Sequence, residues 1–257
     1  MTETITQIGT DFWRIQGEHR FGGMLDVGTQ CSLVRLANGR FVFLDSYTLP
    51  APVMQEVYSI VGAADNVAAI LNLHPFHTLH CAWMHHAFPS AALYGTARHI
   101  DRLPDLPWQK TRCEDAALRQ TFGADFAFSV PEGMPLVCDS ESVHFSSILA
   151  YHRASGVIHV DDTLNFLDKG GPLALLPMNR RLDFHPTLAQ ALDPRASAAD
   201  EFREWAIALG IEWADARTIA TAHNSVRELE PEEFPKLIGE ALGRVKPVLD
   251  RHRAKHG

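Results

Sequence analysis

The first part of the chain alternates apolar and polar positions, the pattern of strands buried on one face. Two such runs cover residues 12–17 and 31–46, and the second contains Asn38-Gly39, which predicts a tight hairpin turn. A helix is predicted over residues 50–63, with proline near its start and glycine near its end. The pattern then predicts a strand at 67–73, a histidine-rich helix at 77–88 and a strand at 91–96.

The second part predicts a similar mixture. Residues 100–135 are irregular around a helix at 114–122, and strands are predicted at 126–130, 134–138, 142–153 and 156–162. Beyond residue 162 we expect helices at 186–194, 197–209 and 231–256, with one strand at 216–223. No repeat or linker divides the sequence, so we expect a single domain over residues 1–257. Two strand-rich halves with outer helices favour a layered α/β architecture over a doubly wound parallel sheet.

Charge and cysteine content narrow the functional classes. The chain has a formal charge of −8, which argues against a nucleic-acid or anionic-membrane surface, because both require a basic patch. No apolar run is long enough for a transmembrane helix, and the N-terminal residues lack a signal-peptide pattern. The four cysteines lie far apart without a CxxC pair, which predicts reduced thiols and a cytoplasmic protein (Cys31, Cys81, Cys113 and Cys138).

Histidine is the informative residue. The chain has fourteen, and five fall between residues 74 and 86. His74 and His77 follow a predicted strand, His144 precedes a strand pair that ends at Asp162, and His223 ends a late strand. Imidazole and carboxylate groups at several strand ends are the ligand set that borderline divalent metals prefer.

This order of motifs resembles the metallo-β-lactamase fold superfamily, whose members carry H-x-H-x-D-H after an early strand. Residues 31–46 look like the opening strand pair of that family, with Asp45 at its carboxylate position. Residues 155–166 (SGVIHVDDTLNF) look like the segment with the bridging carboxylate, which places Asp162 there and Asp161 where glycine is expected. The resemblance implies a four-layer αββα sandwich with two mixed β-sheets flanked by helices. It also implies that His144 and His223 are metal ligands.

The first motif departs from the family pattern. Phe88-Pro89 follows His77 by eleven residues, which aligns His77 with the last histidine of the motif and His74 with the middle one. Asn72 then stands at the first histidine and Phe76 at the aspartate. The motif reads N-x-H-x-F-H, and we expect a reduced site with a single divalent metal.

By this resemblance, the ligand candidates divide between the two metal positions of the family. His74 and His144 would serve one position and His77 and His223 the other, with Asp162 shared. Zinc is the expected metal, with iron or manganese as alternatives.

Two functions from different classes fit these observations. The first is a metal-dependent hydrolase of an unidentified small molecule, with a metal-bound water as nucleophile and Asp162 and His223 as catalytic residues. The second is a catalytically inactive domain of the same fold that binds a ligand or partner in the former pocket, because Asn72 and Phe76 remove two ligands. No nucleic-acid or membrane partner is expected in either case, and a homodimer through the C-terminal helix is an alternative to its covering the sheet.

The remaining candidates have more ordinary interpretations. Asp161 is expected to point away from Asp162, since neighbouring strand residues face opposite sides. His80 is expected to hydrogen-bond a neighbour rather than a metal, and His185 to act either as a ligand or near a helix cap. Absence of a G-x-S-x-G elbow argues against a serine hydrolase. Solvent exposure is predicted for His85 and His86, and cross-strand contact for His152 and His159. Core packing is expected for five aromatic residues, with the wall of an apolar pocket near the site as the alternative (Trp13, Trp83, Trp108, Phe76 and Phe88).

Overall fold

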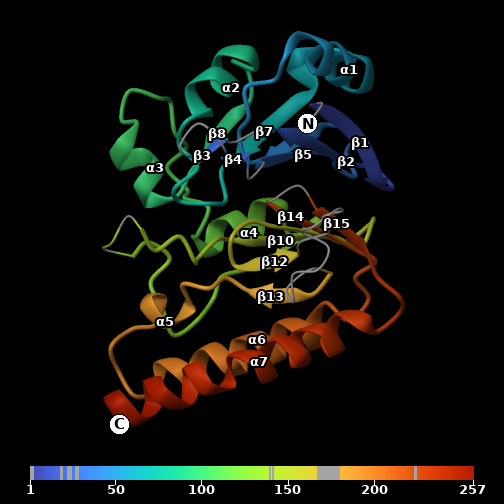
Figure 1. The fold of residues 1–257 in the computed structure, drawn as a ribbon. Helices are drawn as coiled ribbons and strands as arrows, with labels where there is room; N and C mark the ends of the chain where they lie inside the picture. Colours follow the sequence, from blue (N-terminus) through green and yellow to red (C-terminus); the bar gives the residue numbers. More distant parts are fainter. Residues whose placement is uncertain are drawn as a thin grey trace.

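The computed structural model describes residues 3–17, 20–21, 25–26, 29–138, 140, 142–166, 180–222 and 225–257. Two β-sheets face each other, and helices cover their outer faces (Figure 1). In this view α1 and α2 lie above the first sheet, and α6 and α7 lie below the second. The four-layer αββα sandwich expected from the sequence is confirmed.

The first sheet has six strands in the order β1-β2-β5-β6-β7-β8. Its first four strands are antiparallel, and β6, β7 and β8 run parallel to one another. Gly39 has a φ of 84° in the turn between β5 and β6, which fulfils the hairpin prediction. The strands are β1 (Thr4–Gly9), β2 (Phe12–Gly17), β5 (Thr29–Arg35), β6 (Phe41–Leu44), β7 (Val67–Leu71) and β8 (Ala92–Tyr94).

The second sheet has five strands in the order β15-β14-β11-β10-β9, with a parallel pair, β11 and β14, at its centre. The strands are β9 (Phe126–Ser129), β10 (Leu149–His152), β11 (Val157–Val160), β14 (Thr218–Thr221) and β15 (Ser225–Glu228). Two small antiparallel pairs join β3 (Arg20–Phe21) to β4 (Leu25–Asp26) and β12 (Leu164–Phe166) to β13 (Leu182–Phe184).

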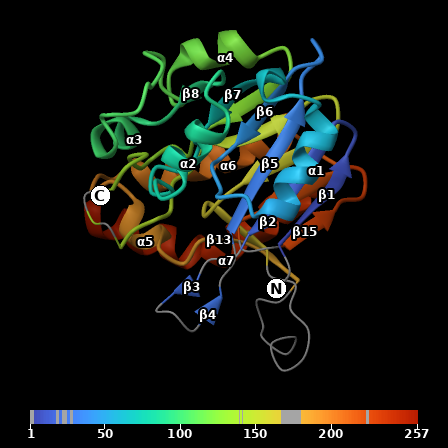
Figure 2. The ribbon, with the colours of Figure 1, turned by 90° about the horizontal axis from the view of Figure 1, so that it is seen from above.

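Helices occupy the outside of the sandwich, and α1 lies over strands of the first sheet when the molecule is viewed from above (Figure 2). Among the described residues, no helix combines the length and apolarity needed to cross a membrane. The helices are α1 (Ala51–Val61), α2 (Cys81–Ala87), α3 (Ala97–Arg102), α4 (Ala116–Phe122), α5 (Leu188–Ala191), α6 (Ala198–Glu212) and α7 (Glu233–His256), with a 3₁₀ turn at Ala64–Asn66.

Three hydrophobic clusters fill the spaces between the four layers. One packs α1 and α2 on the first sheet around Phe43 and Phe88, whose rings lie 5.0 Å apart. A second lies between the sheets and includes Leu71 and Ala150. The third packs α6 and α7 on the second sheet around Phe202. Apolar residues therefore cover both faces of each sheet, because every face meets a packed layer. The burial on one face that alternation predicted is wrong for β6, which is buried along its whole length.

Three expectations for the second half are wrong. Residues 134–138 form no strand, and Pro135 lacks the N–H that a ladder needs. Only Leu149–His152 of the expected 142–153 strand joins the sheet, since the backbone N–H groups of Ser147 and Ile148 bond outside it, to Thr163 Oγ1 and Leu73 O. The segment after residue 162 has more than the one expected strand, because β12, β13 and β15 form there in addition to β14.

Candidate metal centre

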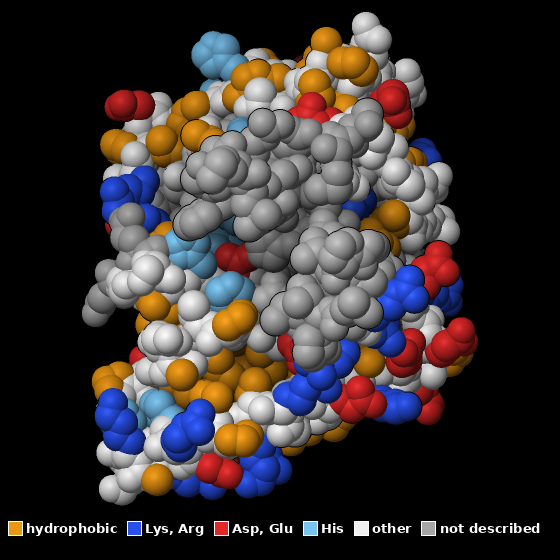
Figure 3. All heavy atoms as spheres, viewed as in Figure 1, with side chains coloured by type: hydrophobic (Ala, Val, Ile, Leu, Met, Phe, Trp, Pro, Cys, Tyr) orange, Lys and Arg blue, Asp and Glu red, His pale blue; other side chains and the backbone are white. Residues whose placement is uncertain are grey.

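The strand ends of the two sheets bring the predicted residues to one edge of the sandwich. Asp45 follows β6, His74 and His77 follow β7, and Asp162 follows β11. Histidine and acidic side chains meet near the middle of the face shown in Figure 3. The ligand atoms of His74, His77 and Asp162 all lie within 4.8 Å of one another. Three of the five predicted metal ligands are therefore assembled within the described part of the chain.

His74 and Asp162 make the closest contact in this trio. The Nε2 atom of His74 lies 3.2 Å from Asp162 Oδ2, and the histidine is fully buried. Despite this approach, His74 Nε2 has no hydrogen bond of good geometry with a described residue. The backbone N–H of Phe76 donates to His74 Nδ1 at 3.2 Å, which leaves Nε2 as the nitrogen aimed at the carboxylate.

His77 lies beside His74 at the beginning of the loop before α2. Its ring stacks on that of His74, with centroids 4.1 Å apart and an interplanar angle of 22°. Its backbone N–H donates to the carbonyl of His74, which closes a tight turn. Burial and the neighbouring His74 lower the pKa of His77 to about 3, so the imidazole is neutral at neutral pH. A neutral imidazole is the form that binds metal.

His144 lies in the loop before β10, in contact with the aromatic ring of Phe76. The His144 ring stacks on the Phe76 ring, with centroids 4.4 Å apart. The Arg98 guanidinium also contacts this ring, at 4.3 Å from the Phe76 centroid. The His144 and His74 ring centroids are 6.4 Å apart. His144 is therefore near the trio, but it does not join its ligand atoms in the described arrangement.

Asp45 connects the centre to both sheets. Its Oδ1 accepts the backbone N–H groups of Leu73 and His74 at 2.8 and 3.3 Å, and its Oδ2 accepts from His159 Nε2 at 2.9 Å. Burial opposes the charge, but the hydrogen bond and charge of His159 lower the pKa of Asp45 below its ordinary value. Asp45 acts as the strand-end acceptor, and it fixes the backbone that carries His74.

The expected orientation of Asp161 is wrong. Its side chain is fully buried and points toward Asp45 and His77, with the ligand atoms of these three residues within 4.8 Å of one another. Strand β11 ends at Val160, so Asp161 belongs to a turn, and strand alternation does not apply to it. Burial and the carboxylates of Asp45 and Asp162 raise the pKa of Asp161 well above its ordinary value.

Asn72 has a structural role at the end of β7. Its Oδ1 accepts from Ser46 Oγ at 2.6 Å, and its Nδ2 donates to the Tyr94 carbonyl at 2.9 Å. Cys81 Sγ is a further donor to Oδ1 at 3.4 Å. The side-chain oxygen of Asn72 is thus engaged within the fold, in keeping with the loss of a ligand at this position.

The residues present fit a divalent cation. Two ligand atoms bonded to zinc at 2.0–2.1 Å in tetrahedral geometry lie roughly 3.3 Å apart, close to the 3.2 Å between His74 Nε2 and Asp162 Oδ2. A buried nitrogen without a hydrogen bond is the other sign of such a site. Binding at Nε2 requires the tautomer with the proton on Nδ1, which loses the bond from Phe76 N–H, a cost of about 1 kcal/mol.

Comparison with known proteins shows the fold. No protein-family model matches the sequence, and no curated protein matches it. Solved structures do match. The DIM-1 metallo-β-lactamase exposed to ceftazidime is similar with a TM-score of 0.57 at 12% identity, over 93% of this chain and 97% of that chain. A metallo-β-lactamase from Erythrobacter litoralis, with β-mercaptoethanol in its active site, gives 0.57 at 18% identity over 92% and 96%. The mono-zinc form of FIM-1 from Pseudomonas aeruginosa gives 0.56 at 12% identity over 94% and 96%.

The chain has the metallo-β-lactamase fold. At these sequence identities the likeness concerns the fold, and the site must be argued from the side chains of this protein.

Within this metallo-β-lactamase fold, not every predicted residue can be placed. His223 lies outside the described residues. His80 bonds Thr48 Oγ1 through Nδ1 at 2.9 Å, as expected for a residue without a metal role. His185 Nδ1 bonds Thr187 Oγ1 at 2.7 Å just before α5, a helix without a side-chain cap bond at its N-cap residue. His86 is exposed as predicted, whereas His85 is half-buried.

His152 and His159 are not direct cross-strand partners. His152 pairs with Val157 and bonds Ser155, while His159 pairs with Ala150. The core interpretation is supported for four of the five aromatic residues, since Phe88 is buried in the cluster against which Trp13, Trp83 and Trp108 pack. Phe76 instead lies at the histidine site, where its ring stacks on His144.

The importance of His159 was missed by the sequence analysis. Its Nδ1 bonds Ser32 Oγ at 3.0 Å, and its Nε2 bonds Asp45, which makes a Ser-His-Asp row between the sheets. All three residues are at most 1% exposed, so no substrate reaches the Ser32 hydroxyl. The row orients Asp45. His159 lies more than a hundred residues from both Ser32 and Asp45 in the sequence, so no local motif indicates the row.

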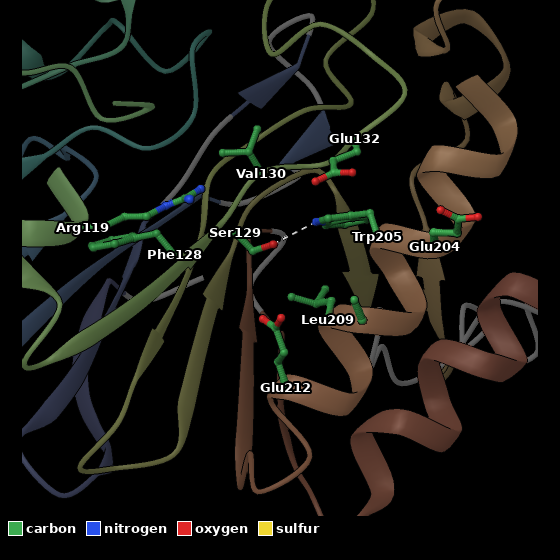
Figure 4. Close-up of a pocket in the computed structure, with 10 residues that line it drawn as sticks. Arg119, Phe128, Ser129, Val130, Glu132, Glu204, Trp205, Leu209 and Glu212 are labelled. Carbon is green, nitrogen blue, oxygen red and sulfur yellow. Dashed lines mark hydrogen bonds between the residues drawn. The ribbon is translucent and has the colours of Figure 1, made fainter. Parts of the chain in front are cut away.

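A cavity of about 350 Å³ lies apart from the histidine site, between β9 and α6 (Figure 4). Trp205 Nε1 donates to Ser129 Oγ at its wall, and Glu132, Glu204 and Glu212 surround it. None of the predicted metal ligands lines this cavity, so it is not the candidate site.

Proposed function

We propose that this protein is a metal-dependent hydrolase of a small molecule, with one catalytic cation held by His74, His77 and Asp162. The observation that carries the proposal is the convergence of these three ligand atoms at the ends of β7 and β11. His144 and His223 are proposed as further ligands on the grounds of the sequence resemblance alone.

Zinc is the proposed metal, with iron or manganese as alternatives. Imidazole nitrogen with carboxylate oxygen is a common zinc ligand set. The similarity to FIM-1, one of whose solved structures is a mono-zinc form, is in keeping with a site that holds a single catalytic ion.

When bound, a divalent cation supplies Lewis acidity, which lowers the pKa of water and polarises a carbonyl or phosphoryl oxygen. The protein holds the ligands in place. Asp45 fixes the backbone of Leu73 and His74, and Thr163 Oγ1 accepts from Ser147 N–H at 3.0 Å and donates to Phe145 O. The second set of bonds ties the turn that carries Asp162 to the loop that carries His144. Phe76 stands at the position of the family carboxylate in the aligned motif, so Asp162 is the proposed proton acceptor. His223 is proposed as the second catalytic residue.

A substrate screen tests the proposal. Chromogenic carboxylic esters, phosphodiesters and β-lactams are offered to zinc-loaded protein, chelated protein, His74→Ala and the control His86→Ala, whose side chain is exposed. We expect chelation and His74→Ala each to lower turnover by roughly 100-fold or more, since both remove the Lewis acid. The control should keep wild-type turnover. Turnover that survives chelation and matches in the two variants would contradict the proposal.

A second candidate is an inactive domain that binds a ligand in the former pocket. Phe76 favours it, because its ring is enclosed by Arg98 and His144 and offers no ligand. The double substitution Asn72→His with Phe76→Asp restores the family motif. Under this candidate it should raise both metal occupancy and turnover of esters or phosphodiesters. No gain in either quantity would count against it.

Three smaller proposals concern the setting of this site. The substrate is proposed to be a small molecule rather than a nucleic acid or membrane, in keeping with the charge of −8. A cytoplasmic location follows from the cysteine pattern. A homodimer through α7 stays a prediction to be tested by light scattering.

A further inference from the structure

A second group of potential ligands lies deeper than the catalytic trio. The ligand atoms of Asp45, His77 and Asp161 lie within 4.8 Å of one another. Asp45 and Asp161 are at most 1% exposed, whereas His77 is partly exposed and faces both groups. The group combines two carboxylates and an imidazole, which is a donor set for a divalent cation.

Asp161 is the residue that needs an explanation. Neither of its carboxylate oxygens has a hydrogen bond of good geometry with a described residue, although both are buried. The ion pair that reaches it within the described chain comes from His159 Nε2 at 3.9 Å, and that nitrogen already bonds Asp45 at 2.9 Å. The side chains of Gln30 and Asp45 also interact with Asp161. A buried carboxylate that makes no hydrogen bond of good geometry is costly, and it is normally protonated, paired or bound to a metal.

Asp45 has capacity for one more partner. Its Oδ1 accepts two backbone N–H groups, and its Oδ2 accepts from His159. A carboxylate oxygen has two acceptor sites, so Oδ2 retains one. Because Asp45, Asp161 and Asp162 lie close together at this edge, a cation would also offset their mutual repulsion.

We propose that Asp45, His77 and Asp161 form an inner, structural cation position behind the catalytic centre. Asp161 supplies the carboxylate that this chain lost at Phe76, but from the turn after β11 instead of the loop after β7. When a cation fills the inner position, His77 is a ligand of that cation. The outer centre then keeps His74 and Asp162 as ligands, and His144 is the nearby imidazole that could complete it. The inference rests on the proposed function only in sharing His77 with the outer centre.

The experiment compares metal stoichiometry in two matched variants. Untagged wild-type protein, Asp161→Asn and Asp162→Asn are incubated with Zn²⁺, dialysed and analysed by elemental mass spectrometry, and circular dichroism confirms their folding. Asparagine keeps the size of aspartate, so each substitution removes a charge and a ligand oxygen without a cavity. Cobalt absorption spectra of the same three proteins report the coordination of each ion independently of any activity.

We expect about two equivalents in the wild type and about one in each variant, with different cobalt spectra for the two variants. If the wild type holds about one equivalent, which Asp161→Asn retains and Asp162→Asn loses, the inner position is overturned and the proposed function survives. That result is also expected if Asp161 only shares a proton with Asp45, since asparagine mimics the protonated acid. One equivalent weakened by both variants means a single shared ion, and it likewise overturns the inner position.

Loss of metal in Asp161→Asn alone would support the inner position and overturn the outer one. A wild type that takes up no zinc would overturn both.

Discussion

Replacement of Asp45 offers a direct test of how the fold holds the candidate centre. In Asp45→Ala the backbone N–H groups of Leu73 and His74 and the Nε2 of His159 lose their acceptor, and all three lie in the interior. A buried donor left without a partner costs roughly 1–3 kcal/mol. His159 can change tautomer, so two backbone donors set the lower bound. Asp45 also has a φ of 61°, which costs alanine about a further 1 kcal/mol.

The expected loss for Asp45→Ala is about 3–7 kcal/mol of unfolding free energy, a large share of the roughly 5–15 kcal/mol typical of a folded domain. Asp45→Asn is the matched control. Its amide oxygen can still accept from Leu73 and His74, its NH₂ can donate to His159, and asparagine tolerates positive φ. We therefore expect about 1 kcal/mol or less for this variant.

Urea unfolding followed by circular dichroism and tryptophan fluorescence measures both free energies. EDTA is present throughout, so that metal binding does not contribute to the comparison. An unchanged slope with urea concentration will show that the variants differ in stability rather than in compactness. A loss below about 1 kcal/mol for alanine, or equal losses for alanine and asparagine, would refute the role assigned to Asp45.

Two further predictions concern the stability of the fold rather than metal binding. Burial lowers the pKa of His99 from 6.5 to about 4. Between pH 6.5 and pH 4 the unfolded chain therefore binds one more proton than the folded chain. Stability falls as the pH drops through this range, by roughly 2 kcal/mol at pH 5. His99→Gln, which can still cap α3, should remove this part of the pH dependence of urea unfolding; a slope equal to that of the wild type would contradict the assignment. At Gly133 an added Cβ would lie 2.0 Å from the Ala198 carbonyl oxygen at a φ of 77°, so Gly133→Ala should lower the thermal midpoint strongly. Gly239→Ala, in α7 with no atom within 4 Å of the added Cβ, should raise stability by up to about 1 kcal/mol. Similar midpoints for the two variants would contradict this packing.

Much of the fold was predictable because local pattern and final environment agree. The strand-forming residues of 31–46 predicted β5 and β6, although these strands are buried on both faces rather than on the one face that alternation indicates. The positions of His74 and Asp162 were predictable for the same reason, since each follows directly from the end of a buried strand. Strand ends in parallel segments collect at one edge of a sheet, so the separate motifs converge there.

The remaining features depend on contacts between distant segments or on turns. The orientation of Asp161 was predicted from strand alternation, which stops at Val160. Asn72 was assigned to a lost ligand position, and its bonds to Ser46 and Tyr94 come from neighbouring strand ends that no local pattern reveals. Short pairs such as β12 and β13 have three residues each, too few to give a periodic signal.

The most direct test of the central claim is the metal content of the purified protein, measured by elemental mass spectrometry without a His-tag and without added metal. The wild type is compared with His74→Ala and Asp162→Ala. We predict about one equivalent or more of zinc, iron or manganese in the wild type and a clear loss in both variants, because each variant removes a ligand of the catalytic centre. Less than about a tenth of an equivalent in the wild type, unchanged after incubation with each metal, or equal metal in all three proteins, would contradict the account.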